Sequence, residues 1–207
     1  YYGLRKKWQK LEALHLYDCY VPLVDVPDRE YPFSQACEMV REGLRPLGEE
    51  YGKALDRLLT ERWIDVYETE GKTSGAYAWG TYKTHPYMLL NYSGRLSDIF
   101  TLAHEAGHCL HSYFSDARQT FANSHYPIFL AEIASTVNEN LLVRHLLDRC
   151  DPSTREGRLQ EAYLLNHYIE EFKGTVFRQA MFAEFEWDCH QHAESGQPLT
   201  PDFLCGF

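Results

Sequence analysis

The chain has 207 residues, of which 44% are hydrophobic and 24% are charged, a composition that excludes a disordered chain and allows one sizeable core. The formal net charge of −10 disfavours nucleic acid as a partner, because an acidic surface repels phosphate groups. Because no apolar run approaches the ~20 residues that cross a bilayer, and the six cysteines include no close pair, we expect a cytoplasmic protein without membrane partners or disulfides.

The N-terminal part of the chain is predicted to be helical, with one extended interruption. Residues 1–20 carry apolar side chains at helical spacing. Pro22, Pro27 and Pro32 follow, and they predict an extended connector because proline breaks a helix. A second helix is expected over residues 34–59, where a serine can cap the first turn and glycines and a proline interrupt the pattern.

A small β-sheet is expected over about residues 63–94. Residues 63–67 alternate in polarity, and residues 87–92 are rich in aromatic and apolar side chains, which favours strands. Between them, residues 71–80 combine turn-forming residues with a short strand-like run. The sequence therefore predicts a sheet of about three strands.

From about residue 96 onward the sequence is almost wholly helical. Four helices are expected, over residues 97–115, 128–149, 155–173 and 175–195. The residues that interrupt the helical pattern are Pro152, Gly174 and Gly196. We found no repeat, low-complexity segment or linker that would split the chain. The prediction is a mostly α fold, a single domain over residues 1–207 with a small sheet before the helices.

One short motif on the helix at 97–115 indicates metal binding: His104-Glu105-Ala106-Gly107-His108. His104 and His108 project from one face of a helix about one turn, or ~5.4 Å, apart, so both imidazoles can bind one metal ion. Glu105 can then act on a water at the metal without being a ligand, as in zinc hydrolases. Two core histidines on an ordinary helix are the alternative, since short motifs also arise by chance.

A catalytic zinc ion needs a third protein ligand. His111 follows His104 by seven residues, about 10.5 Å along the helix, and zinc bonds of about 2 Å do not span that distance. We therefore expect His111 to pack or to act indirectly. A metzincin is excluded because its motif, HExxHxxGxxH, would need glycine and histidine where this chain has His111 and Phe114.

The third ligand is expected from the helix at 128–149. Its residues Glu132, Ser135, Thr136 and Glu139 form one polar stripe among apolar neighbours. Plain exposure to solvent would also explain such a stripe, but the two-histidine motif lacks a ligand, and we therefore favour Glu132. Glu139 lies two turns further on the same face and could accept a hydrogen bond from the non-ligating nitrogen of a zinc histidine.

Several sequence blocks extend the pattern well beyond the motif. They are Gly71-Lys72-Thr73-Ser74-Gly75-Ala76-Tyr77, Pro86-Tyr87-Met88-Leu89-Leu90-Asn91-Tyr92, Thr101-Leu102-Ala103-His104-Glu105-Ala106-Gly107-His108-Cys109-Leu110-His111, Phe129-Leu130-Ala131-Glu132-Ile133-Ala134-Ser135 and Arg178-Gln179-Ala180-Met181-Phe182-Ala183-Glu184-Phe185-Glu186. In order and spacing, over about residues 10–205, they resemble the thimet-oligopeptidase-like metallopeptidases and, within these, oligoendopeptidase F.

This resemblance implies a ligand set of His104, His108 and Glu132, with the motif glutamate as the general base. The separation from His108 to Glu132 is 24 residues. Other zinc peptidases with a glutamate ligand, such as the thermolysin-like and aminopeptidase-like enzymes, place it nearer, where this chain has Pro127 or Ile128. Neither side chain can ligate a metal, so the thermolysin-like and aminopeptidase-like classes are disfavoured.

The resemblance also implies a helical, clam-like shell around a deep channel, in a chain that continues beyond the present one. In that family a later segment containing His and Tyr donates a hydrogen bond to the oxyanion, and we find no counterpart before Phe207. We therefore expect a fragment that retains the metal site and lacks this donor. Because the loss of one donor costs about 10²–10³ in rate, the isolated chain is expected to be weakly active or inactive.

The expected function is that of a zinc metalloendopeptidase that holds one Zn²⁺ and hydrolyses short oligopeptides at internal bonds, with Glu105 activating the water. Gly75, Ala76 and Tyr77 are expected beside the cleft, where a strand edge could pair with an extended peptide, and a structural hairpin is the equal alternative. Further candidates for the cleft wall are Tyr92, His125 and Tyr126. The competing class is a zinc- or peptide-binding protein without turnover, for which Glu105 would be unnecessary. A helical scaffold with a chance motif would leave the polar stripe unexplained.

Overall fold

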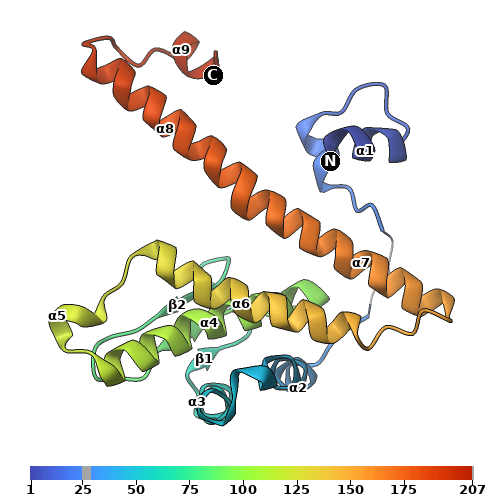
Figure 1. Cartoon of the computed structure of the whole chain (residues 1–207), viewed down its shortest axis with the longest axis vertical. Helices are drawn as coiled ribbons and strands as arrows, with labels where there is room; N and C mark the ends of the chain where they lie inside the picture. The colour runs from blue at the N-terminus through green and yellow to red at the C-terminus, as the bar shows by residue number, and fades with distance from the viewer. Residues whose placement is uncertain (25–28, 207) are drawn as a thin grey trace. The chain divides into compact units, whose positions relative to one another are not determined.

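The computed structural model describes residues 1–24 and 29–206, so Pro27 of the predicted connector lies outside the described residues. The described chain is mostly helical with one small sheet (Figure 1), which confirms the predicted fold class. Contacts divide it into two compact units: residues 29–157 form the first, and residues 1–24 with 158–206 form the second. None of the described helices is long and apolar enough to cross a membrane.

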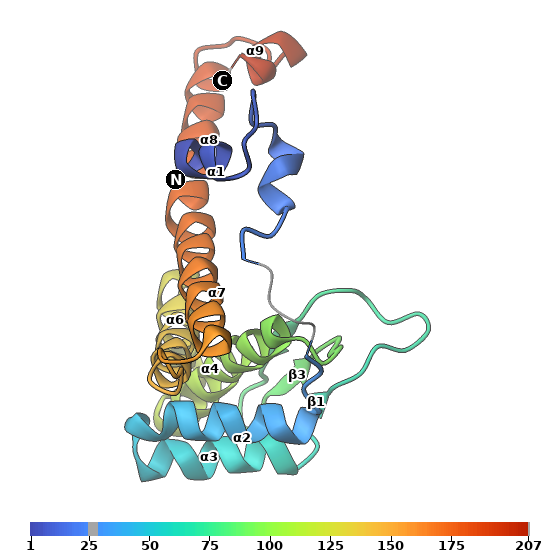
Figure 2. The same cartoon turned by 90° about the vertical axis from the view of Figure 1, so that its right-hand side faces the viewer.

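Two helices lie side by side at the start of the first unit (Figure 2). α2 (Phe33–Leu44) passes through a 3₁₀ turn (Arg45–Leu47) into α3 (Glu49–Thr60). At the junction Gly48 has a φ of 90°, a conformation that glycine adopts without steric cost, so the chain can reverse there. The single interrupted helix predicted over residues 34–59 is therefore two helices joined by a turn.

A three-stranded sheet follows, as predicted. β1 (Ile64–Asp65) pairs in parallel with β3 (Tyr87–Leu89), and β2 (Tyr77–Trp79) pairs antiparallel with the other edge of β3. The register places Ala78 opposite Met88. The strand order β1-β3-β2 leaves one edge of β2 without a strand partner among the described residues.

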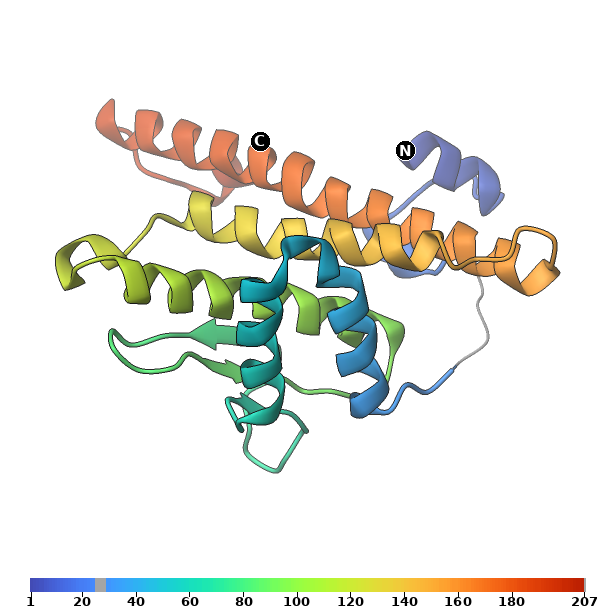
Figure 3. The same ribbon diagram turned by 60° about the horizontal axis from the view of Figure 1, so that its bottom comes forward.

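Two long helices form the centre of the first unit. α4 (Leu96–Arg118) leads through the short α5 (Phe121–Ser124) to α6 (Ile128–Leu147), which returns beside α4 (Figure 3). Both long helices were predicted, at 97–115 and 128–149, and their bounds agree with the structure to within three residues.

The hydrophobic core of the first unit surrounds α4. Ile99, Leu102, Ala106 and Leu110 recur at helical spacing and are completely buried. α4 packs against α2, α3, α6 and the sheet. Because each buried Leu or Ile contributes about 1.5–3 kcal/mol, α4 is held firmly on several sides. Side chains on its remaining face therefore have a rigid support.

The second unit is built on a long helix. α7 (Arg155–Phe172) continues through a π-helical turn (Lys173–Phe177) into α8 (Arg178–Glu194), and the short α9 (Pro201–Cys205) follows. The break predicted at Gly174 is therefore wrong. The chain accommodates this glycine by widening one turn, where π-helical hydrogen bonding replaces the α-helical pattern.

The N-terminal helix predicted over residues 1–20 is much shorter in the structure. It is reduced to α1 (Tyr2–Trp8), and a 3₁₀ turn (Leu16–Tyr20) follows after a loop. An isolated helix of this size is marginal without packing, and several apolar side chains of α1 remain exposed. Arg5 ties this segment to α7, because its buried guanidinium pairs with Glu170 at 2.8 Å.

Candidate metal centre

Two histidines converge on one face of α4. The Nε2 atoms of His104 and His108 are 3.1 Å apart. Their ring centroids are 4.7 Å apart and the ring planes are nearly perpendicular, at 84°. Two imidazole nitrogens in this arrangement can both reach one metal ion.

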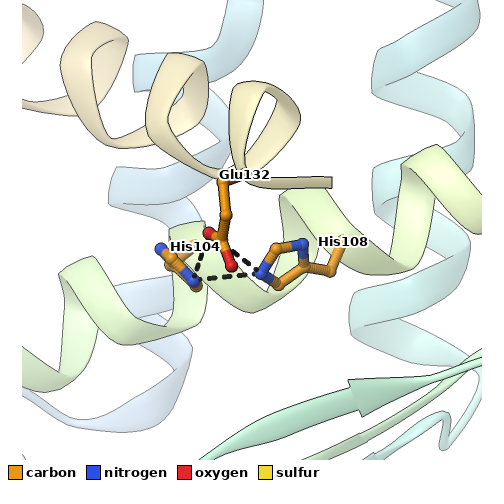
Figure 4. A group of neighbouring side chains, drawn as sticks. All are labelled: His104, His108 and Glu132. Atoms are coloured by element: carbon orange, nitrogen blue, oxygen red, sulfur yellow. Dashed lines mark hydrogen bonds and ion pairs between the residues drawn. The ribbon is translucent and has the colours of Figure 1, made fainter. Parts of the chain in front are cut away.

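Glu132 reaches the same point from α6 (Figure 4). Its Oε2 atom lies 3.6 Å from Nε2 of His104 and 3.6 Å from Nε2 of His108. Ligand atoms at zinc bond lengths of about 2.0–2.1 Å in a tetrahedron are about 3.4 Å apart, which is close to these separations. Two imidazole nitrogens and one carboxylate oxygen form one of the donor sets found in catalytic zinc sites, with a fourth position left for water or substrate.

Hydroxyl groups hold Glu132 in place. Ser135 Oγ donates to Glu132 Oε2 at 2.9 Å, and Thr136 Oγ1 donates to the backbone oxygen of Glu132 at 2.6 Å. Ser135 is completely buried. The polar stripe predicted on this helix is therefore turned toward α4, and plain exposure to solvent does not explain it.

Glu139 supports His104 from behind. Its Oε1 atom is 2.9 Å from His104 Nδ1, which is the contact expected from the sequence. A proton on Nδ1 leaves the Nε2 lone pair free to face Glu132 and His108. Burial lowers the pKa of His104, but Glu139 and the other nearby carboxylates outweigh it and raise the pKa overall. The pKa of His108 is lowered by burial and by the charge of His104.

Glu105 is buried beside these groups and lines the same cleft. Its Oε2 atom has no hydrogen-bond partner among the described residues. Burial raises the pKa of this carboxyl group, and His104 counteracts the increase in part. A buried carboxylate with an unsatisfied oxygen next to a reaction centre is suited to accept a proton.

Gly107 allows α4 and α6 to approach closely at the candidate metal centre. A Cβ atom at this position would lie 2.6 Å from Ser135 Cα and 2.7 Å from the backbone oxygen of Ala134. Both are backbone atoms and cannot move independently of the helix. The absence of a side chain at Gly107 therefore brings Glu132 within reach of the histidines.

Asn138 fixes the register of α6. It is 1% exposed, and its Nδ2 atom donates to the backbone oxygen of Ala103 at 2.9 Å and to the Tyr51 hydroxyl at 2.8 Å. Burial raises the pKa of Tyr51 to about 12, so this hydroxyl stays protonated. One side chain thus links α6 to both α4 and α3.

A cleft of about 740 Å³ lies beside the convergent side chains. Its lining includes His104, Glu105 and Glu132 from the two helices, and Ala76 and Tyr77 at the start of β2. The unpaired edge belongs to the same strand. A buried carboxylate, three candidate metal ligands and the strand that carries the free edge therefore border one cavity, which is an arrangement suited to the hydrolysis of an extended chain.

Comparison with known proteins gives the family. The model of Peptidase family M3 matches residues 1–206. The chain belongs to peptidase family M3. This is a family of metallopeptidases, and the resemblance to oligoendopeptidase F predicted from the sequence is confirmed by the relatives.

Curated relatives of this M3 chain are bacterial. Oligopeptidase PepF of Bacillus subtilis (strain 168) is 47% identical over 204 residues, and the chromosomal oligoendopeptidase F of Lactococcus lactis subsp. cremoris is 44% identical over 204 residues. Each alignment covers 99% of this chain, but only 30% and 33% of the respective relative. The chain thus spans about a third of the length of these relatives.

A solved structure shows the same fold. A crystal structure of a protein from Chlamydophila abortus, described as a peptidase, superposes with a TM-score of 0.78 and is 43% identical. The superposition covers 98% of this chain and 33% of that one. The fold of this chain is therefore shared with that solved structure.

His111 has the packing role predicted for it in this M3 chain. Its ring stacks on Tyr126 with centroids 3.8 Å apart, and burial lowers its pKa. Tyr126 and His125 line the cleft, as the sequence suggested. Tyr92 does not, because its ring is buried and its hydroxyl donates to the backbone oxygen of Tyr31 at 2.7 Å.

The three residues predicted to contact substrate have different positions. Ala76 and Tyr77 line the cleft, whereas Gly75 is not among its lining residues. The backbone oxygen of Gly75 accepts a hydrogen bond from Asn91 Nδ2 at 2.8 Å, and its φ is 93°. Gly75 thus shapes the turn that leads into β2.

Sequence reasoning missed several residues of the site. Ser112 and Asp116 line the cleft one and two turns beyond His108. Their spacing of four and eight residues from that histidine was the available signal, because it keeps them on one face of the helix. Gly107 was also overlooked, although a glycine in the middle of a helix often marks close packing.

Proposed function

We propose that this chain carries the metal centre of a zinc-dependent endopeptidase that hydrolyses internal bonds of short oligopeptides. The observation that carries the proposal is the convergence of His104, His108 and Glu132 from two helices, with the buried Glu105 beside them. The relatives are named oligopeptidase and oligoendopeptidase F, and this supports the same substrate class.

In this proposal His104, His108 and Glu132 would hold one Zn²⁺ ion, which when bound would supply Lewis acidity to polarise a peptide carbonyl and acidify water. Glu105 accepts the proton of the attacking water through its unpaired Oε2 atom. It then passes the same proton to the leaving amine. Glu139 keeps the His104 ring oriented throughout, since it is bound to Nδ1 rather than to the ligating nitrogen.

The proposed peptide site is the unpaired edge of β2. An extended substrate would add as a further strand, with backbone hydrogen bonds to Ala76 and Tyr77. The location of both residues in the lining of the metal cleft supports this arrangement over a purely structural hairpin. Hydrogen bonds to the peptide backbone do not depend on the substrate side chains, so this mode of binding suits an enzyme that cleaves many different peptides.

A zinc- or peptide-binding protein without turnover is the second candidate. Metal binding alone needs only the three ligands, and peptide binding needs only the strand edge. Glu105 is needed for neither. Its Oε2 atom is buried without a partner in the part of the chain that the structure describes, which costs free energy on the order of 1–3 kcal/mol. Its presence therefore favours turnover.

The test combines metal analysis with a cleavage assay. The purified protein is loaded with zinc, its metal content is measured, and quenched fluorescent peptides are offered to the wild type and to Glu105→Gln. We expect one zinc per chain in both proteins and a loss of about 10²–10⁴ in kcat in the variant. Because the isolated chain is expected to be weakly active or inactive, the assay uses protein of the full length of the relatives. Bound zinc with no cleavage by this full-length wild type would favour the binding protein, and absence of bound zinc would contradict both candidates.

A further inference from the structure

The polar face of α4 continues beyond the proposed metal ligand His108. Ser112 and Asp116 follow one and two turns later, and both line the cleft that holds the metal centre. At about 1.5 Å per residue, Asp116 lies about 12 Å along the helix from His108. This end of the cleft has no part in the proposed proton transfers, and its lining residues therefore need another explanation.

Asp116 is a partly buried carboxylate without a cation. Within residues 1–24 and 29–206 it has no ion pair and no hydrogen bond. Two basic side chains have other contacts: Arg118 pairs with Glu50, and the Lys83 ammonium group lies 5.7 Å from the centre of the Tyr82 ring. Neither Arg118 nor Lys83 lines the cleft. The carboxylate is thus available to a ligand.

Aromatic rings surround this end of the cleft. Tyr82 and Phe121 meet edge to face with centroids 5.5 Å apart, and both line the cavity. The Tyr126 hydroxyl is 2.6 Å from Ser112 Oγ, so these two hydroxyls form a hydrogen bond. The pKa of Tyr126 is raised chiefly by burial and further by the charge of Asp116, which agrees with a carboxylate close to this ring. Ring faces attract cations and cover the methylene stems of Lys and Arg.

We propose that Ser112, Asp116, Phe121 and Tyr126 form an acidic subsite that binds a cationic side chain, Arg or Lys, of the peptide substrate. Asp116 would pair with the positive charge, while the rings would cover the aliphatic stem. The inference rests on the proposed function and adds a specificity determinant to it. An acidic side chain at the same position is repelled, and a neutral one leaves the carboxylate unpaired.

The position of the subsite limits which substrate residue it recognises. An extended peptide advances by about 3.3 Å per residue, so a distance of about 12 Å corresponds to three or four residues. The long side chain of Arg or Lys shortens this interval. The recognised residue is therefore expected within about four positions of the scissile bond. A preference for Arg or Lys at one position only would indicate a subsite, whereas a general effect of charge would appear at every position.

The experiment is a positional scan with the zinc-loaded protein. Quenched fluorescent peptides share one sequence and carry Arg or Gln at one position at a time, and the ratio of kcat/KM for Arg over Gln is measured at each position. A charge-assisted pair in a partly buried site should give a ratio of about 10 or more at one position. In Asp116→Asn this ratio should fall to about 2 or less, while Asp116→Glu should retain part of it.

Asp148→Asn is the matched control, because Asp148 is an exposed carboxylate at the end of α6 that pairs with Arg144. It removes the same charge outside the cleft and should leave both the activity and the Arg-to-Gln ratio unchanged. Wild-type ratios of about 2 or less at every position, or a ratio that persists in folded Asp116→Asn, would overturn the acidic subsite.

Failure of the proposed function can be recognised separately. The scan uses protein of the full length of the relatives, because the isolated chain is expected to be weakly active or inactive. If this full-length wild type cleaves none of the peptides, catalysis is refuted, and the same Arg and Gln peptides are then titrated as fluorescent ligands. A tighter Kd for the Arg peptide that is lost in Asp116→Asn would support the subsite in a binding protein. Equal Kd values for the two peptides would refute the subsite as well.

Discussion

Glu139 does not itself line the cleft, yet it contacts the candidate metal centre through Nδ1 of His104. We expect Glu139→Ala to weaken zinc affinity about 10- to 100-fold, because the His104 ring loses the partner that fixes its orientation and tautomer. Competition of the protein with a chromophoric chelator measures the Kd for zinc. Glu61→Ala is the control, since Glu61 is an exposed glutamate at the end of α3, and equal zinc affinity in both variants would contradict the role of Glu139.

At the scale of single residues, the sequence predicts what helix geometry alone determines. His104 and His108 had to share a face because they are four residues apart, and Glu105 followed from the same motif. Glu132 required an inference across 24 residues, and the polar stripe on its helix supplied that inference. Asp116 was not predicted, because a carboxylate on a helix is usually solvated and only the tertiary structure places it in a cleft.

At the scale of elements, the crossing of α4 and α6 depends on Gly107. We expect Gly107→Ala to destabilise the protein by about 1–3 kcal/mol, because the added methyl group meets the backbone of Ala134 and Ser135. This reverses the ordinary effect of the substitution, since alanine favours a helix over glycine by about 1 kcal/mol. Urea unfolding monitored by circular dichroism measures the change.

The chain contains a matched control for this prediction. Gly52 also lies within a helix, α3, but a Cβ atom there would meet nothing within 4 Å. Gly52→Ala should therefore stabilise the protein by about 0.5–1 kcal/mol. If the two substitutions change stability equally, in sign and size, the effect at Gly107 comes from helix propensity alone, and close packing at this position is contradicted.

The elements differ in how well the sequence predicted them. The bounds of α4 and α6 were predicted closely, because each carries a long periodic pattern and a clear start. The interruption between α2 and α3 was expected from its glycines and proline, but the reversal of the chain there was not, since the positive φ of Gly48 is a property of the folded backbone. The strands were predicted too long, because strand length depends on pairing with distant residues rather than on local composition.

At the scale of the whole molecule, the candidate ligands join two helices that are separated by the α5 segment. A metal ion bound by His104, His108 and Glu132 would therefore link α4 to α6 in the folded state only, so its binding free energy adds to stability. The same two helices are already held together by Gly107 and Asn138. These contacts do not involve a metal ion, so we expect zinc to strengthen an existing contact between α4 and α6 rather than to create the fold.

Zinc is accordingly expected to stabilise the first unit without changing its secondary structure. At a free zinc concentration about 100 times the Kd, the gain is about 2.7 kcal/mol, which corresponds to a rise of about 5 °C or more in Tm. Calorimetry with zinc and with a chelator measures this shift, and hydrogen exchange should show increased protection in α4 and α6. His108→Ala removes one proposed ligand and should abolish the shift. An equal shift in this variant would mean that zinc acts elsewhere on the chain, and the three-residue centre would then be wrong.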